Sequence, residues 1–398
     1  MRIRMAHPIT RRKFLCHLGR CAFLCTSSTI LPWSFESSPV QAVSLKKGAL
    51  GRKLSPYFTP LDDRIIRCDL CPHLCEVPSG ERGLCRVREN IRGQYYSLVY
   101  GNPCAIQVDP IEKKPFYHVL PTTRSFSIAT AGCNFDCKFC QNWEISQARP
   151  EETYNFKLSP EEAVQQALRY GCRSIASTYV EPTVFIEYML EMGRLTRAHP
   201  LLKVMHSNGY INQTPLNDLC DVLDAACIDL KGFSEEFYRS MTDGSLQPVL
   251  NTLKQLKSRG IHTEIVNLII PGKNDDMIQV RAMCQWIREE LGHEVPLHFS
   301  RFYPLYKLKS IPPTPVDTLE MACKVAAEEG LNYVYIGNVA EHPNGHTYCP
   351  KCKKMLIRRI GYNVKVLGFK DGQCEYCGES IPGIWKITNH IKSSSDSI

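Results

Sequence analysis

Residues 132–143 have the sequence GCNFDCKFCQNW and place three cysteines, Cys133, Cys137 and Cys140, within eight positions. Three thiolates at this spacing can hold three irons of a [4Fe-4S] cube and leave the fourth iron open. Catalytic metal sites keep an open position in the same way, because substrate must reach the metal. A structural zinc site is the alternative, but such a site takes four ligands and this loop offers three. We therefore expect a reactive iron–sulfur cluster in this loop.

The sequence around this loop has the pattern of an α/β fold. From residue 125 to residue 339, short β-branched or apolar runs alternate with longer amphipathic stretches, as in repeated βα units around a parallel sheet. The strand candidates are SFSIATAG (125–132), SIASTYVE (174–181), KVMHSNG (203–209), AACIDLK (225–231), HTEIVNLII (262–270), PLHFSRF (296–302) and YVYIGNV (333–339). Six or seven units are too few for a closed eight-stranded barrel. The pattern predicts an open, partial (β/α)6 barrel with its site at the carboxyl ends of the strands.

Helix boundaries are also visible between these runs. Residues 159–162 (SPEE) form a capping box with proline at the first helical position, and Gly171 ends that helix. Residues 314–317 (TPVD) and Gly330 predict the same start and stop near the end of the barrel.

Polar residues lie in or just after successive strand candidates. They are Cys133, Glu181, Asn208, Asp229, Lys231, Asn267 and His298. The carboxyl ends of parallel strands meet at one mouth, so these side chains are candidates for a common site. The alternative for any one of them is that it caps a loop or satisfies a buried backbone group.

A second cysteine cluster precedes the barrel. Cys68, Cys71, Cys75 and Cys85 have the spacing Cx2Cx3Cx9C. Four thiolates close a tetrahedral site, so a structural zinc and a second iron–sulfur cluster both fit, and we favour zinc. The spacing does not choose between the two metals.

A third cysteine cluster follows the barrel. Cys349 and Cys352 form one CxxC pair, Cys374 and Cys377 form another, and 21 residues separate the pairs. This spacing is typical of a zinc ribbon, so we expect Zn²⁺ there. Zinc ribbons often bind nucleic acid, but this one fits a small stabilising module equally well.

Charge and thiol content limit the function classes. The net charge is +8, but residues 1–53 hold ten Lys or Arg and one acid, Glu36. The remainder carries 38 basic and 39 acidic residues and is therefore close to neutral, which argues against nucleic-acid binding. Most of the 20 cysteines fall into spaced clusters that indicate metal ligation rather than disulfides.

The charged segment resembles an export signal. Residues 10–15 (TRRKFL) are similar to a twin-arginine motif, and an apolar stretch follows to Leu31 with Arg20 inside it. That route exports folded proteins with cofactors inserted; a non-functional leader would leave the protein in the cytoplasm. No other segment is apolar and long enough for a membrane helix. We expect a leader at 1–42, a four-cysteine module at 43–117, the core at 118–340, and a ribbon-like module with tail at 341–398.

Several unusual strings together resemble a known family. The three-cysteine loop matches the signature of the radical S-adenosylmethionine (SAM) superfamily. The order of strings further resembles the AmmeMemoRadiSam-system radical SAM enzymes, relatives of the pyruvate formate-lyase activating enzymes. The strings are RCDLCPHLCEVPSGERGLCRVREN (67–90), DPIEKKPFYHVLP (109–121), GCNFDCKFCQNWEIS (132–146), VNLIIPGKND (266–275), LHFSRFYP (297–304) and YVYIGNV (333–339).

The resemblance implies a [4Fe-4S] cluster held by Cys133, Cys137 and Cys140, with SAM on the open iron. It further implies reductive cleavage of SAM to a 5′-deoxyadenosyl radical, a low-potential electron donor, and Memo-like and AMMECR1-like protein partners. Glu181 takes the place of a carboxylate near the SAM amino group. The residues agree with such roles: a carboxylate suits an ammonium, a lysine suits a carboxylate, and asparagine amides suit ribose hydroxyls. The expected cofactor-binding residues beyond the cysteines are Glu181, Asn208, Asp229, Lys231, Asn267 and His298, and Lys231 is also a catalytic candidate.

Two classes of function remain at this stage. One is a radical SAM enzyme that abstracts hydrogen from an unidentified protein or small molecule, with glycyl-radical-enzyme activation as a variant. The other is a non-catalytic protein with three structural metal sites that binds RNA or protein. The second class predicts zinc at every cysteine cluster and no cleavage of SAM.

Overall fold

The structure is a computed structural model that describes residues 38–39 and 44–387. The leader expected at residues 1–42 therefore lies almost wholly outside the described residues, as does the tail from residue 388 onward. In the described part of the chain, no helix combines the length and apolar character needed to cross a membrane.

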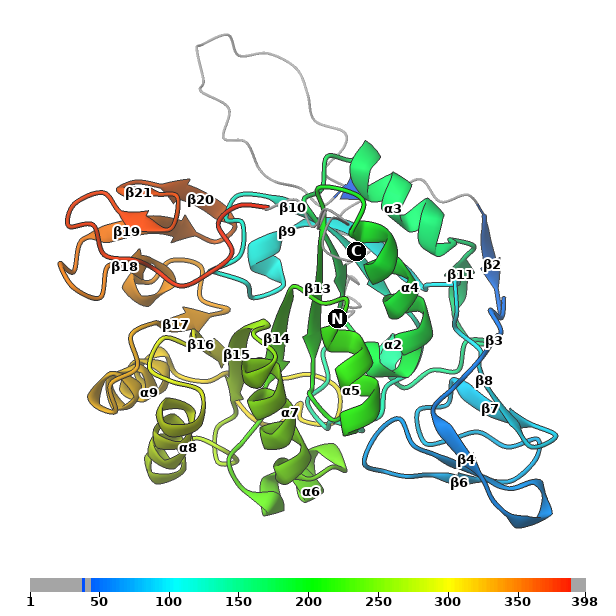
Figure 1. Ribbon diagram of the computed structural model, residues 1–398. Coiled ribbons are helices and arrows are strands. Elements are labelled where there is room, and N and C mark those ends of the chain that lie inside the picture. Colours follow the sequence, from blue (N-terminus) through cyan, green and yellow to red (C-terminus); the bar gives the residue numbers. More distant parts are fainter. Residues whose placement is uncertain (1–37, 40–43, 388–398) are drawn as a thin grey trace, which may run out of the picture. The chain divides into compact units, whose positions relative to one another are not determined.

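A nine-stranded sheet forms the centre of the fold (Figure 1). In spatial order its strands are β1 (Ser38–Pro39), β9 (Ala105–Pro110), β10 (Arg124–Ala129), β12 (Ser174–Ser177), β13 (Leu202–Ser207), β14 (Ala225–Asp229), β15 (His262–Ile269), β16 (Leu297–Arg301) and β17 (Val334–Gly337). The strands from β10 to β17 are parallel and follow chain order. Each contains residues of one of the seven runs expected from the sequence, so the α/β class and the parallel strands are confirmed.

The sheet is mixed, because two strands at one edge are antiparallel. β9 pairs with β10 from Arg124 opposite Pro110 to Ala129 opposite Ala105, and β1 pairs with β9. Neither strand was expected from the sequence.

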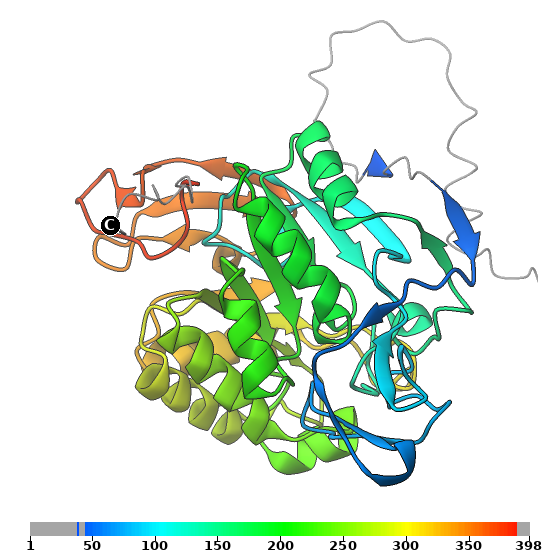
Figure 2. The same ribbon diagram turned by 45° about the vertical axis from the view of Figure 1, so that its right-hand side comes forward.

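Helices follow the parallel strands and lie on the outer side of the sheet (Figure 2). They are α2 (Trp143–Ser146), α3 (Pro160–Arg169), α4 (Ile186–Thr196), α5 (Gln213–Cys220), α6 (Glu235–Thr242), α7 (Leu246–Ser258), α8 (Met277–Glu290) and α9 (Val316–Glu328). The strands are buried on both faces, as β12 shows with all four residues buried, which is the usual state of a parallel sheet under helices.

Both predicted helices begin within the predicted runs, but only the first of the two predicted side-chain caps is present. Ser159 and Glu162 form the reciprocal capping box at the start of α3, and Gly171 follows that helix at φ +64°. At α9 the N-cap is Pro315, which has no side chain that could cap the helix. The hydroxyl of Thr314 instead donates to the carbonyl of Ile269 at 2.6 Å, so a tertiary contact replaces the cap.

Small sheets surround the four-cysteine segment before the core. One contains β3 (Lys53–Leu54), β8 (Gln94–Ser97) and β7 (Arg88–Ile91), and another contains β4 (Phe58–Pro60), β5 (Ile66–Cys68) and β6 (Glu76–Val77). A third pairs β2 (Leu45–Lys47) with β11 (Tyr154–Phe156). Short strands of this kind bury little apolar surface, which is why such segments commonly depend on a metal.

The segment after β17 forms two further small sheets, in orange and red in Figure 1. Their strands are β18 (Thr347–Tyr348), β19 (Met355–Ile360) and β20 (Asn363–Val366), then β21 (Phe369–Lys370) and β22 (Gln373–Cys374). His118 joins this segment to the core: its Nδ1 lies 2.7 Å from the carbonyl oxygen of Pro382, and its Nε2 lies 2.7 Å from the hydroxyl of Tyr335.

Candidate functional site

The three-cysteine loop follows β10 and is anchored on both sides. Gly132 begins it at φ +89°, a backbone conformation that favours glycine. The backbone N–H groups of Asp136 and Lys138 donate to the carbonyls of Thr242 and Met241, each at 3.0 Å, at the end of α6. These bonds hold the loop against the end of α6.

The cysteines of this loop are enclosed. Cys137 is buried, and Cys133 and Cys140 are partly buried. The N–H of Phe135 lies 3.4 Å from Cys133 Sγ, and Cys140 Sγ lies 3.3 Å from Ser146 Oγ. Burial raises the pKa of Cys133 well above its ordinary value, whereas for Cys137 burial raises it to about 12 although Lys231 opposes the shift. Binding of iron would draw the protons off these thiols.

Glu181 lies after β12 and is fully engaged. Its two carboxylate oxygens accept hydrogen bonds from Thr183 N–H at 2.9 Å, Ser207 Oγ at 2.8 Å and Asn208 N–H at 2.8 Å. Burial raises the pKa of Glu181, and these hydrogen bonds oppose the shift. The carboxylate therefore ties the end of β12 to the end of β13.

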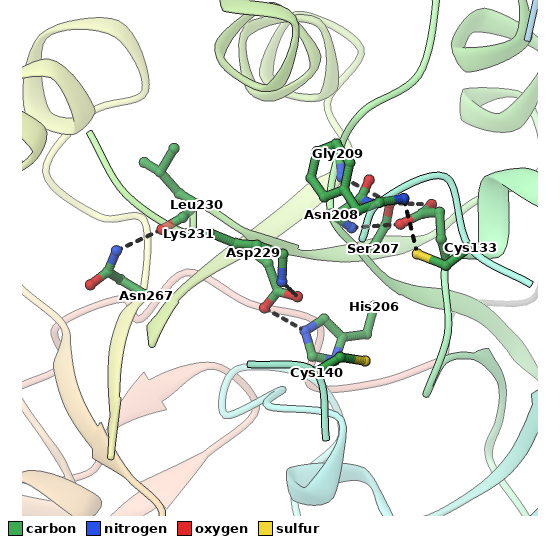
Figure 3. Close-up of polar contacts among 12 residues, drawn as sticks. Cys133, Cys140, His206, Ser207, Asn208, Gly209, Asp229, Leu230, Lys231 and Asn267 are labelled. Atoms are coloured by element: carbon green, nitrogen blue, oxygen red, sulfur yellow. Dashed lines mark hydrogen bonds and ion pairs between the residues drawn. The ribbon is translucent and has the colours of Figure 1, made fainter. Parts of the chain in front are cut away.

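Asn208 connects this group to the cysteine loop. Its Nδ2 donates to Asn134 Oδ1 at 2.8 Å, and Asn134 directly follows Cys133. Figure 3 shows Asn208 and Cys133 on the same side of the site. Two of the predicted site residues, Glu181 and Asn208, are thus brought together beside the first cysteine.

Asp229 and Lys231 form an ion pair at the end of β14 (Figure 3). Lys231 Nζ lies 2.9 Å from Asp229 Oδ2, and His206 Nε2 lies 2.9 Å from Oδ1. Burial raises the pKa of Asp229, but Lys231 and His206 together hold it well below its ordinary range. Burial lowers the pKa of Lys231, but Asp229 and Cys137 outweigh burial and keep the amine protonated. A charged lysine therefore stands beside Cys137.

Asn267 is placed inside β15, next to this ion pair. Its Nδ2 donates to the carbonyl of Leu230 at 2.7 Å. Its Oδ1 is buried and has no hydrogen-bond partner among the described residues. An acceptor of this kind is costly to leave unpaired, so it fits a site that receives a hydrogen-bond donor from a ligand.

Among the described residues, the contacts of His298 do not include any other candidate site residue. Its Nε2 lies 2.7 Å from Glu264 Oε2, and its ring packs against Tyr117 and Tyr335. Glu264 also accepts from the backbone N–H of His118 at 2.8 Å. His298 is therefore part of the buried network that carries the C-terminal segment.

Besides Asn134, three residues of the site were not expected from the sequence. His206 contacts Asp229, Ser207 contacts Glu181, and Ser146 contacts Cys140. His206 and Ser207 stand directly before Asn208 in the candidate strand 203–209, which is the signal that could have indicated them.

The two flanking cysteine clusters differ in geometry. Cys349 Sγ lies 3.5 Å from Cys377 Sγ, and Cys352 Sγ lies 3.7 Å from Cys374 Sγ. A tetrahedral ion with bonds of about 2.3 Å to sulfur requires sulfurs about 3.8 Å apart, so this group could hold a single metal ion. Cys68, Cys71, Cys75 and Cys85 line one cavity near the three-cysteine loop.

This geometry defines a class of protein. It is an α/β enzyme whose strand ends carry a three-cysteine loop and a charged lysine. The chain matches the model of the Radical SAM superfamily over residues 127–283. It is 47% identical to the uncharacterized protein MJ0808 of Methanocaldococcus jannaschii over 82% of this chain and 97% of that protein. The chain belongs to the radical SAM superfamily, and membership implies catalysis with a [4Fe-4S] cluster and SAM.

More distant similarities complete the comparison. Over 29% of this chain and 36% of that protein, the chain is 22% identical to the (2S)-3-sulfopropanediol dehydratase activating enzyme of Klebsiella oxytoca. The crystal structure of a radical SAM methyltransferase from Sphaerobacter thermophilus has a TM-score of 0.45 and 13% identity, over 73% of this chain and 78% of that chain. That structural likeness is too low to support a conclusion about function.

Proposed function

We propose that the protein cleaves SAM reductively and uses the product to abstract hydrogen from a protein or small-molecule substrate. The observation that supports this most directly is the position of Lys231, a partly buried cation held by Asp229 beside Cys137. When bound, the cluster and SAM supply one electron and a 5′-deoxyadenosyl radical. The protein itself supplies orientation and a dry site.

Each residue has a definite task in this proposal. Cys133, Cys137 and Cys140 hold three irons, and Ser146 orients the Cys140 sulfur. Lys231 attracts a carboxylate, and Asp229 fixes the lysine in place. Phe139 is buried with its ring 5.6 Å from Lys231 Nζ, so it excludes water from the same corner. Asn267 Oδ1 is free to accept from a ligand hydroxyl.

Anaerobic assay of the reconstituted protein tests the proposal. The protein is loaded with iron and sulfide, mixed with dithionite and SAM, and 5′-deoxyadenosine is measured by mass spectrometry. We expect product from the wild type, none from Cys140→Ala, and wild-type product from Cys323→Ala, a buried cysteine in α9 outside the site. No product from the wild type, or equal product from Cys140→Ala, would reject the proposal.

Lys231→Met separates a role in binding from a role in folding. We expect it to retain the iron content of the wild type while 5′-deoxyadenosine formation falls at least tenfold, because the lysine no longer attracts the carboxylate. The matched control is Lys254→Met, in which a half-exposed lysine paired with Glu290 on the surface is replaced.

A second candidate is activation of a glycyl-radical enzyme. The similarity to the sulfopropanediol dehydratase activating enzyme favours it. Modification of a substrate linked to Memo-like and AMMECR1-like proteins is the other branch, and both branches require a low-potential electron donor. Deuterium transfer into 5′-deoxyadenosine from a labelled glycine-loop peptide or from a labelled small molecule distinguishes them. We further propose Zn²⁺ in the C-terminal four-cysteine site, because its sulfur spacing suits a tetrahedral ion.

A further inference from the structure

The four cysteines before the core surround one cavity. Cys68, Cys71, Cys75 and Cys85 line it together with Arg88, Tyr95 and Asn134. The N–H of Cys68 donates to the carbonyl of Cys75 at 2.8 Å, so β5 and the turn after it bring the first three cysteines together. Cys85 comes from the next loop.

In the described part of the chain, the sulfur atoms of this group are not in contact with one another, unlike those of the C-terminal group. In residues 44–387, the cysteine group with ligand atoms all within 4.8 Å of one another is the C-terminal one, with Cys349 and Cys377 as a pair at 3.5 Å. In the described residues, sulfur–sulfur contacts below 4 Å join Cys349 to Cys377 and Cys352 to Cys374, and no such contact joins Cys68, Cys71, Cys75 or Cys85. Ligands of one zinc ion must be about 3.8 Å apart. Ligands of an iron–sulfur cube stand further apart, because each binds a different iron.

A buried hydroxyl also faces this cavity. Tyr95 is 0% exposed, and its OH has no hydrogen-bond partner in the described part of the chain. A tyrosine hydroxyl is a proton donor, and this one lies on the wall of a cavity that four cysteines also line. A cluster would provide the acceptor, because its sulfides and thiolates carry negative charge.

A buried cation completes the lining. Arg88 is 0% exposed and donates to Glu187, to Ser55 Oγ at 2.9 Å and to the carbonyl of Val184 at 3.2 Å. Its positive charge on the wall of the cavity would offset part of the negative charge of a thiolate-bound cluster. The backbone also comes close to this space: a Cβ at Gly83 would lie 2.9 Å from the Tyr95 hydroxyl and 3.6 Å from Cys75 Sγ.

We propose that Cys68, Cys71, Cys75 and Cys85 hold a second iron–sulfur cluster, a fully ligated [4Fe-4S] cube, and not the zinc ion that the sequence analysis favours. The site adjoins the three-cysteine loop. His73 Nε2 lies 2.7 Å from the carbonyl oxygen of Asn134, and a Cβ at Gly132 would lie 2.6 Å from the carbonyl oxygen of Cys85. With every iron bound to a cysteine, this cluster would not bind SAM, and the contacts between the two segments would allow it to exchange electrons with a cluster in the loop.

Metal analysis of the full chain tests this proposal without relying on SAM cleavage. The wild type is compared with a loop variant, Cys133→Ala/Cys137→Ala/Cys140→Ala, which leaves the N-terminal module unchanged. Both proteins are reconstituted anaerobically and analysed for iron, acid-labile sulfide and zinc. We expect about eight irons in the wild type and about four in the loop variant, with a [4Fe-4S] Mössbauer signal and about one zinc in each.

A different metal content in the loop variant would contradict the proposal. A loop variant with less than about one iron and with about two zinc ions per chain would overturn the proposal. A second variant, Cys71→Ser/Cys75→Ser, keeps the three-cysteine loop. We expect it to lose about four irons relative to the wild type, and full wild-type iron content in it would also overturn the proposal. In the dithionite-reduced wild type we expect an EPR spectrum broadened by spin coupling between the two clusters. A spectrum equal to the unbroadened sum of the two variants' spectra would overturn electron exchange between the sites.

Discussion

Lys231 donates a hydrogen bond of 2.9 Å to Asp229, and His206 lies 2.9 Å from the other oxygen of the same carboxylate. One acid on β14 therefore serves a lysine two residues away and a histidine on β13. Burial lowers the pKa of Lys231, but the ionised carboxylate of Asp229 outweighs this effect, so the lysine keeps its charge. This arrangement prepares a cation beside the cysteine loop before any ligand arrives.

Replacement of Asp229 by Asn should cost stability as well as activity. The lysine would lose its counter-charge, so we expect the free energy of unfolding to fall by about 2 kcal/mol. Urea unfolding of the purified protein measures this. The control is Asp221→Asn, which breaks the ion pair between Asp221 and Arg259. The Asp221 side chain is 66% exposed, so this change should alter the free energy of unfolding by less than about 1 kcal/mol. Equal losses in both variants would show that the partly buried pair of Asp229 and Lys231 has no special role.

Gly132→Ala tests the contact between the cysteine loop and the N-terminal module. Gly132 has φ +89°, and a Cβ there would lie 2.5 Å from Val87 Cγ1 and 2.6 Å from the carbonyl oxygen of Cys85. The control is Gly171→Ala, because Gly171 has φ +64° and no atom lies within 4 Å of its Cβ position. Both variants carry the cost of a positive φ, about 1 kcal/mol, but only Gly132→Ala adds a backbone clash. We expect it to lose at least about 2 kcal/mol more in urea unfolding; similar losses would contradict the contact.

The buried amine of Lys203 should make stability depend on pH. Lys203 lies in β13 and donates to Ser177 Oγ at 2.7 Å, and burial lowers its pKa to about 7. In the unfolded chain the amine titrates near 10.5. Between these pH values the unfolded state binds more protons than the native state, so the free energy of unfolding rises with pH. Below pH 7 the buried amine destabilises the native state most.

Lys203→Met removes that dependence. We expect the stability of the wild type relative to this variant to rise by about 1.4 kcal/mol per pH unit between pH 7 and 10 and to level off below pH 7. Urea unfolding at several pH values provides the measurement. A difference that is constant across the range would mean that Lys203 is protonated in the native protein.

Cys374→Ser should release the metal of the C-terminal segment. Cys374 Sγ lies 3.7 Å from Cys352 Sγ, and this segment packs on Tyr335 and His118 of the core. We expect one metal ion fewer per chain and a lower melting temperature, because ion binding contributes directly to folding of such segments. Cys323→Ser, in α9, should keep the metal content of the wild type. Unchanged metal content in Cys374→Ser would contradict the site.

Local patterns in the sequence were sufficient for much of the fold. The parallel strands, the capping box at Ser159 and the position of the three-cysteine loop depend on apolar periodicity and on neighbouring residues, and all of these are present. The cap expected at Thr314 is absent, because its hydroxyl bonds Ile269, which is 45 positions away in the chain. A pattern of adjacent letters carries no information about such a partner.

The sequence by itself determined which residues are able to ligate metal and that the strands run in parallel, because spacing and burial pattern act over short distances along the chain. Only the tertiary structure decided which polar groups meet. Strand register sets His206 opposite Cys227 and thereby next to Asp229, and the fold turns His298 toward Glu264 instead of the cysteine loop. Register and packing arise from many weak contacts between distant segments, which no single motif records.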